Sequence, residues 1–159
     1  LEGSREEMAK HKLSAKERQK GLIMLKMAAL LQYTLTGIPS LYYGDEAGLD
    51  GGEDPYNRGC YPWGNEDEEL IEHYRFLGRL RREHEVFIDG EFVPVSAAMG
   101  CVAYERRGRG ERIMTVANRN SHPIVYILPE EGYEVLTGGA VSGRELCIEK
   151  ETAAILIKR

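Results

Sequence analysis

The chain has 159 residues, and its 26 acidic and 21 basic side chains give a net charge of −5 at neutral pH. Its apolar fraction of 42% is enough for one ordinary or two small packed cores. The longest apolar stretch, residues 22–31, contains Lys26 and is too short to cross a bilayer, so no membrane association is expected. The basic residues are scattered, which excludes a broad face for nucleic-acid phosphates.

Cys60, Cys101 and Cys147 form no CxxC pair, and their odd number leaves one thiol unpaired. Disulfide scaffolds are typical of oxidising compartments, so this pattern favours a reducing one, and we expect a cytoplasmic protein. The four histidines are scattered and show no catalytic spacing. No cofactor or metal is expected.

A capping-box sequence marks the start of the first predicted helix. Ser14 and Glu17 are spaced so that each side chain accepts a hydrogen bond from the other residue's backbone amide. We expect the helix to run from Ser14 to about Thr36, where Gly37 and Pro39 end it. Its apolar residues occupy more than one face, which indicates packing on several sides. These residues are Leu22, Ile23, Leu25, Met27, Leu30 and Leu31.

A short apolar and aromatic run, Ile38–Gly44, follows between glycines and a proline. This pattern predicts a buried strand of the kind found in parallel sheets. The stretch Asp45–Gly64 is rich in glycine and acidic residues and has no periodicity, so it is predicted to be a long loop. Loops of this length are usually functional or disordered.

A second helix is predicted to begin near Asn65 or Asp67 and to end near His84. The acidic residues at its start face the positive end of the helix dipole. One face carries apolar side chains at helical spacing. These are Leu70, Tyr74, Leu77 and Leu80.

Beyond a boundary near Glu85–Gly90, short alternating segments separated by turn residues predict an antiparallel β-sandwich. The predicted strands are Phe92–Ser96, Cys101–Arg106, Arg112–Asn118, Ile124–Leu128, Tyr133–Leu136, Leu146–Glu149 and Ala153–Ile157. We therefore divide the chain into residues 1–85 and residues 86–159, and we expect the second part to fold independently.

Three linked motifs carry a family resemblance: GIPSLYYGDE from Gly37 to Glu46, DPYNR from Asp54 to Arg58, and YPW from Tyr61 to Trp63. In this order they resemble the α-amylase family of glycoside hydrolases, and most closely its neopullulanase, cyclomaltodextrinase and maltogenic amylase branch. The resemblance implies the last helix–strand–helix of a (β/α)8 TIM barrel, followed by an all-β domain C. The expected fold class is thus an α+β fragment.

In that family, the loop after the last barrel strand carries an Asp-x-x-x-Arg pair that contacts the sugar, and Asp54 and Arg58 match this pair. A carboxylate can accept hydrogen bonds from two neighbouring hydroxyls, and a guanidinium can bridge a carboxylate and a sugar oxygen. The alternative is a salt bridge that only fixes the loop. Both roles are compatible.

Three aromatic residues, Tyr56, Tyr61 and Trp63, are secondary candidates for substrate binding. Their flat apolar faces suit stacking against the C–H faces of a glucose ring. Packing that closes the loop onto the barrel is an equally good interpretation, because tyrosine and tryptophan commonly bury most of their area.

Asp45 and Glu46 resemble the acid pair of a glycosidase, but adjacent residues at a strand end point apart, so we interpret both as structural. The resemblance places the family's nucleophile, general acid and third aspartate before the segments matched here, so no catalytic residue is assigned. The acidic run also lacks the ligand pattern of an EF-hand.

The function predicted for the whole protein is retaining hydrolysis of α-1,4-glucans such as starch oligosaccharides, pullulan or cyclodextrins, with α-glucan oligosaccharides as partners. The chain alone is expected to be inactive. One alternative is a non-catalytic carbohydrate-binding or interaction module, and another, within the family, is a glucosyl transferase or isomerase. Because most of a barrel is missing, residues 14–84 are expected either to expose apolar surface and self-associate or to hide that surface against the sandwich.

Overall fold

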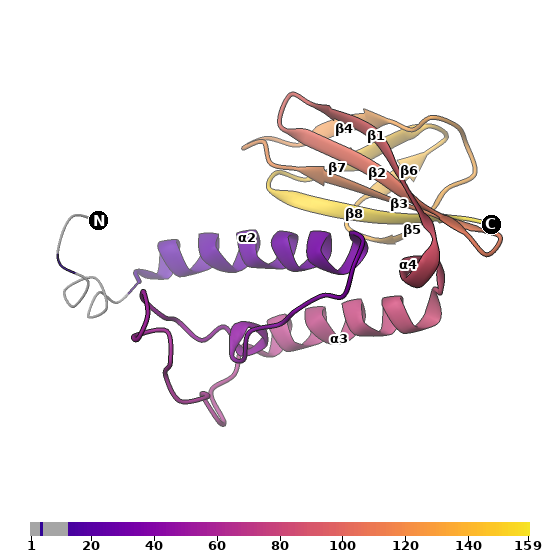
Figure 1. Cartoon of the computed structure of the whole chain (residues 1–159). Helices are drawn as coiled ribbons and strands as arrows, with labels where there is room; N and C mark the ends of the chain where they lie inside the picture. The colour runs from indigo at the N-terminus through magenta and orange to yellow at the C-terminus, as the bar shows by residue number, and fades with distance from the viewer. Residues whose placement is uncertain (1–3, 5–12) are drawn as a thin grey trace.

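The computed structural model describes Ser4 and residues 13–159 (Figure 1). Helix α2 (Ala15–Thr34), the short 3-10 helix η1 (Asp45–Ala47), helix α3 (Glu68–Glu83) and helix α4 (Val86–Asp89) precede all the strands. The strands are β1 (Glu91–Ala98), β2 (Cys101–Gly108), β3 (Glu111–Asn118), β4 (Ile124–Ile127), β5 (Glu134–Thr137), β6 (Ala140–Ser142), β7 (Glu145–Ile148) and β8 (Thr152–Lys158). No helix in this described part is long and apolar enough to span a membrane.

Helix α2 begins as its sequence predicts. The Ser14 amide donates to Glu17 Oε2 (2.8 Å), and the Glu17 amide donates to Ser14 Oγ (3.3 Å), which completes the capping box. The helix ends at Thr34, slightly before the predicted Thr36, because Leu35 is already extended (ψ 172°). No basic residue lies in its last turn, so its C-terminal carbonyls depend on donors from elsewhere in the chain.

The predicted strand Ile38–Gly44 does not form; this prediction was wrong for the chain as described. The segment has no sheet partner, although Figure 1 shows it running back alongside α2 and α3 toward η1. A strand exists only through hydrogen bonds to neighbouring strands, and the described residues supply no neighbour here. Several apolar side chains consequently face water: Ile38 is 95% exposed, and Leu41, Tyr42 and Tyr43 are also exposed.

Helix α3 follows its prediction closely. Asp67 caps its start by accepting a hydrogen bond from the Leu70 amide (3.0 Å). The four residues predicted to be buried, Leu70, Tyr74, Leu77 and Leu80, are all buried. Helix α4, which the sequence did not reveal, fills the predicted boundary and buries Val86 and Phe87.

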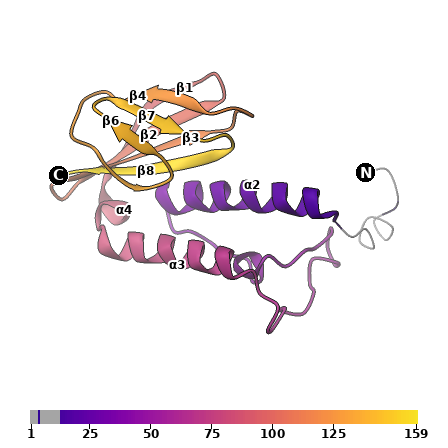
Figure 2. The ribbon, with the colours of Figure 1, turned by 180° about the vertical axis from the view of Figure 1, so that it is seen from behind.

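The β part is an antiparallel sandwich, as predicted. A five-stranded sheet has the order β1-β2-β3-β8-β5, and a three-stranded sheet has the order β4-β7-β6. Strand β6, which is three residues long, was missed by the sequence analysis, whereas each of the seven predicted segments overlaps a strand. Figures 1 and 2 show the larger sheet lying between the smaller sheet and the two long helices.

The larger sheet is therefore a middle layer with a core on each face. Along β8, Ile155 packs into the core that contains α2 and α3, whereas its neighbour Leu156 packs into the core beneath the smaller sheet. Along β3, Ile113 and Met114 divide in the same way. This alternation is the period of two expected of a strand, but here both faces are apolar.

The helices hide much of their apolar surface against the sandwich, one of the outcomes anticipated for residues 14–84. Met27 and Leu30 of α2 and Leu77 of α3 are buried in the same core as Ile113 and Ile155 of the sheet. Burial of this kind stabilises by about 25 cal/mol per Å² of apolar surface. The segment after α2 stays uncovered.

Candidate functional site

The loop that follows η1 is closed at its base by backbone contacts. The Asp67 amide at the start of α3 donates to the Ala47 carbonyl (3.0 Å), and the Leu49 amide donates to the Gly44 carbonyl (2.9 Å). Residues 48–67 therefore leave and re-enter the helical layer at neighbouring points, and the loop extends past the start of α3, alongside the first turns of α2 (Figure 1). All five predicted substrate-binding residues lie on this loop.

Asp54 and Arg58 form the predicted pair. Arg58 Nε donates to Asp54 Oδ1 (2.8 Å), and Arg58 Nη2 lies 2.7 Å from the same oxygen. Both side chains are largely exposed, at 63% and 66%. Among the described residues, Asp54 Oδ2 has no hydrogen-bond partner, so one carboxylate oxygen and part of the guanidinium face solvent.

The aromatic residues of the loop are only partly packed. The rings of Tyr61 and Trp63 lie 4.6 Å apart between centroids and are tilted by 49°. Trp63 is 80% exposed and Tyr56 is 44% exposed, so neither is buried by loop closure. Partial burial, followed by the charges of Glu46 and Glu66, raises the pKa of the Tyr61 phenol.

Asp45 and Glu46 lie in η1, directly before the loop. Glu46 Oε2 accepts a hydrogen bond from the Gly44 amide (2.9 Å), a local backbone contact of the kind expected for a structural residue. Burial, and then the neighbouring Glu46 charge, raise the pKa of Asp45. Burial, reinforced by these two carboxylates and Tyr33, raises the pKa of Tyr74 to about 12.

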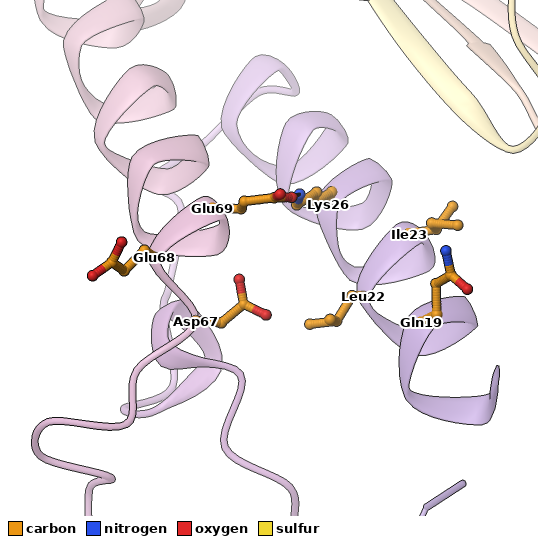
Figure 3. A pocket seen from close by; sticks show the side chains of 7 residues that line it. All are labelled: Gln19, Leu22, Ile23, Lys26, Asp67, Glu68 and Glu69. Atoms are coloured by element: carbon orange, nitrogen blue, oxygen red, sulfur yellow. Dashed lines mark hydrogen bonds and ion pairs between the residues drawn. The ribbon is translucent and has the colours of Figure 1, made fainter. Parts of the chain in front are cut away.

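A pocket of about 440 Å³ lies between α2 and the start of α3, next to the base of the loop. Figure 3 shows Lys26 of α2 and Glu69 of α3 meeting across it, an ion pair of 2.9 Å. The pocket is lined by Gln19, Leu22, Ile23, Lys26, Asp67, Glu68 and Glu69. None of the predicted substrate-binding residues lines it. Within the described ranges, no three acidic, histidine or cysteine side chains gather as metal ligands.

Sequence comparison relates the chain to amylopullulanases and cyclomaltodextrinases. No protein-family model matches it. It is 43% identical over 83 residues to an amylopullulanase of Thermoanaerobacter thermohydrosulfuricus, covering 52% of this chain and 6% of the relative. It is 37% identical over 113 residues to a cyclomaltodextrinase of Thermoanaerobacter pseudethanolicus, covering 69% of this chain and 20% of the relative.

Structure comparison also relates the chain to α-amylases, over most of its length. An α-amylase from Geobacillus thermoleovorans, solved as a complex with acarbose, superposes with a TM-score of 0.75 at 27% identity and covers 87% of this chain and 34% of its own. An Anoxybacillus α-amylase gives a TM-score of 0.73 at 30% identity, over 86% of this chain and 32% of its own. The chain matches the C-terminal region of α-amylase-family enzymes. The resemblance to this family inferred from the three motifs is confirmed.

The chain spans about a fifth of the cyclomaltodextrinase it matches and about a third of the α-amylase structures. The α-amylase-family likeness explains why the helical layer precedes a β-sandwich.

Two residues that hold the loop were missed by the sequence analysis. Arg18 contacts Gly48 and Asp50, and the Tyr43 hydroxyl donates to the Gly59 carbonyl (2.9 Å). Tyr43 lies inside the GIPSLYYGDE motif, whereas Arg18 lies in the predicted first helix, outside all three motifs.

Proposed function

We propose that the whole protein is a retaining glycoside hydrolase acting on α-1,4-glucans, and that this chain supplies part of its sugar-binding surface. The names of the relatives support this, because cyclomaltodextrinases, a maltogenic α-amylase and amylopullulanases recur among them. The α-amylase from Geobacillus thermoleovorans also holds acarbose in its structure. Asp54 and Arg58 are proposed to hold one glucose unit of the substrate.

The exposed Asp54–Arg58 pair is the observation that carries this proposal. Ion pairs that are more than half exposed contribute little to folding stability, so a purely structural role gives little reason for the pair. As a ligand site, the pair is well arranged. The carboxylate is oriented by Arg58 and keeps Oδ2 available for sugar hydroxyls, and the guanidinium has donors left for a sugar oxygen.

Trp63, Tyr61 and Tyr56 are proposed to add apolar contact to the same ligand. An indole that is 80% exposed on a loop offers a flat face at no cost of unpacking. Ring faces of this kind bind the C–H surfaces of a pyranose, while hydrogen bonds fix its orientation. Their contribution is expected to be to affinity more than to specificity.

The chain by itself is proposed to bind glucan without cleaving it. A glycosidase sets two carboxyl groups about 5 Å apart or more across the scissile bond. Asp45 and Glu46 do not offer this arrangement, since Glu46 is engaged by the Gly44 amide within the same turn. On the whole protein, product analysis with and without an added sugar acceptor separates hydrolysis from glucosyl transfer.

Titration calorimetry with maltotriose and β-cyclodextrin on the 159-residue chain tests the proposal. Asp54→Asn and Arg58→Met are each expected to weaken binding about ten- to a hundredfold, the effect of removing a charged hydrogen bond to a ligand. Hydrolysis of either sugar above background by the chain, abolished by Glu46→Gln, would contradict the assignment of Asp45 and Glu46.

An exposed ion pair elsewhere supplies the matched control. Arg75 and Glu72 of α3 are 65% and 60% exposed and form a pair three residues apart, but they lie outside the loop. Arg75→Met is expected to leave sugar affinity unchanged. Equal losses in Arg75→Met and Arg58→Met would show that the effect is one of net charge, and the proposed site would be rejected.

A further inference from the structure

Arg18, in the first turns of α2, reaches across to the base of the loop that carries Asp54 and Arg58. Its Nη1 donates to the Gly48 carbonyl (3.1 Å) and to Asp50 Oδ1 (3.1 Å). Its Nη2 lies 4.0 Å from Asp67 Oδ2, where the loop ends. One guanidinium thus contacts both ends of the loop.

The fit around Arg18 is close. Gly48 has a φ of +69°, and a Cβ placed on it would lie 3.0 Å from Arg18 Nη2 and 3.3 Å from the Cβ of Asp67. A side chain at position 48 would therefore both strain the backbone and push the guanidinium away. A planar fork with several donors suits such a junction, because it binds a carbonyl and carboxylates in one geometry.

Between its ends the loop is held by further contacts in the described part of the chain. The Tyr43 hydroxyl reaches the Gly59 carbonyl (2.9 Å), and the Asp54–Arg58 pair lies within the loop itself. Fixing a loop's ends reduces the number of conformations that its middle can adopt. The position of Asp54 relative to the helices therefore depends on the base of the loop, which Arg18 closes together with the Asp67–Ala47 and Leu49–Gly44 backbone hydrogen bonds.

We propose that Arg18 is a positioning residue for glucan binding: it closes the base of loop 48–67 and thereby orients Asp54 and Arg58. This inference rests on the proposed function of that pair. Arg18 is 38% exposed and Asp50 is 57% exposed, so its loss is expected to loosen the loop without unfolding the protein.

Hydrogen exchange on the 159-residue chain tests, without any ligand, whether Arg18 holds the base of the loop. In Arg18→Met, amides of residues 48–67 are expected to exchange about tenfold faster, while those of β3 and β8 keep their rates. Trp63 is the chain's single tryptophan, so a fall in its fluorescence anisotropy reports directly on the loop. Arg18→Lys is expected to be intermediate, because an ammonium cannot reproduce the planar fork.

Arg75→Met is the control, since it removes an equally long cation from the other helix without touching the loop. Maltotriose affinity measured on the same variants is expected to fall about tenfold in Arg18→Met and to stay unchanged in the control. If loop exchange rates and Trp63 anisotropy do not change in Arg18→Met, Arg18 does not hold the loop, and the proposal is refuted. If the wild-type chain binds no maltotriose, the proposed function fails, and positioning for glucan fails with it, even where exchange shows the loop loosened.

Discussion

Arg106 of strand β2 donates to the backbone carbonyl of Leu35 at the end of helix α2, with 3.1 Å between Nη1 and the oxygen. Its Nη2 donates to the carbonyl of Gly90 (2.9 Å), and the side chain is buried. Arg81 of α3 reaches the same helix end, donating to the Tyr33 carbonyl (2.8 Å). Two cations from distant segments thus replace the basic residue that the last turn of α2 lacks.

Replacing Arg106 with Met is expected to lower the free energy of unfolding by about 2–4 kcal/mol, because buried carbonyls lose charged donors. Burial, and then the charge of Arg81, lower the pKa of Arg106, yet the guanidinium stays protonated. Urea unfolding followed by circular dichroism gives the value. Arg75→Met, on an exposed helix face, is expected to change it by no more than about 0.5 kcal/mol. A cost no larger than that of the control would show that the carbonyls are satisfied by water.

Truncating Ile155 or Leu156 to Ala tests whether the two cores form one cooperative unit. The two residues are adjacent on β8 but pack into different cores, and both are fully buried. Each substitution is expected to cost about 2–5 kcal/mol. The sequence alone predicts that residues 86–159 fold independently, but β3 and β8 contribute to both cores. In both variants, we therefore expect helix signal and sheet exchange protection to be lost in the same transition. Two separate transitions would instead favour a sandwich that folds independently.

The buried carboxylate of Glu105 is expected to make the stability of the fold depend on pH. It is fully buried on β2, and hydrogen bonds from Tyr133, Arg107 and Arg112 outweigh the effect of burial, so its pKa lies below the ordinary 4.5. A carboxyl group whose pKa is lowered by folding stabilises the fold fully at pH values above its pKa in the unfolded chain. This contribution is lost as the pH falls through its pKa in the folded protein. Stability is therefore expected to fall below about pH 4.5.

Glu105→Gln is expected to be less stable than the wild type at pH 7 and to approach it in the acid range. Denaturant midpoints measured from pH 3 to 7 provide the comparison, with exposed Glu145→Gln as the control. A constant difference between wild type and Glu105→Gln at every pH would mean that packing, and not charge, explains the loss.

The uncovered segment after α2 is expected to drive self-association of the isolated chain. Ile38 is 95% exposed, and Leu41, Tyr42 and Tyr43 lie beside it in sequence, all without a sheet partner among the described residues. Ile38→Asp is expected to shift the chain toward monomer in size exclusion with light scattering. Thr36→Asp, at a nearby exposed position, controls for charge. A wild-type chain that is monomeric at every concentration would refute this prediction.

Local signals predicted the elements that local interactions create. Ser14 and Glu17 fixed the start of α2, and the spacing of Leu70, Tyr74 and Leu77 gave the buried face of α3. Strand 38–44 failed because a strand depends on neighbours, which a local pattern cannot supply. Strand β6 was missed because three residues hold too little alternation to be recognised.

The loop residues Asp54 and Arg58 were predicted from a motif, and the structure brings them together as a pair. Arg18 and Arg106 were not predicted, because the carbonyls of Gly48 and Leu35 that they bind lie 30 and 71 positions away in sequence, and a backbone carbonyl leaves no mark on residue type. A sequence pattern identifies side chains that meet side chains. It contains little about side chains that meet the backbone.

Because the larger sheet is covered on both faces, its central strands are expected to tolerate few amino-acid substitutions. From 153 to 157 every position of β8 is buried, whereas burial along β4 alternates between half-buried and exposed. In a saturation library scored for folded protein, β4 should therefore accept polar residues at every second position. Strand β8 should reject polar residues at each position from 153 to 157. Its substitution pattern would therefore lack the period of two of a strand and would resemble that of a helix buried on all sides.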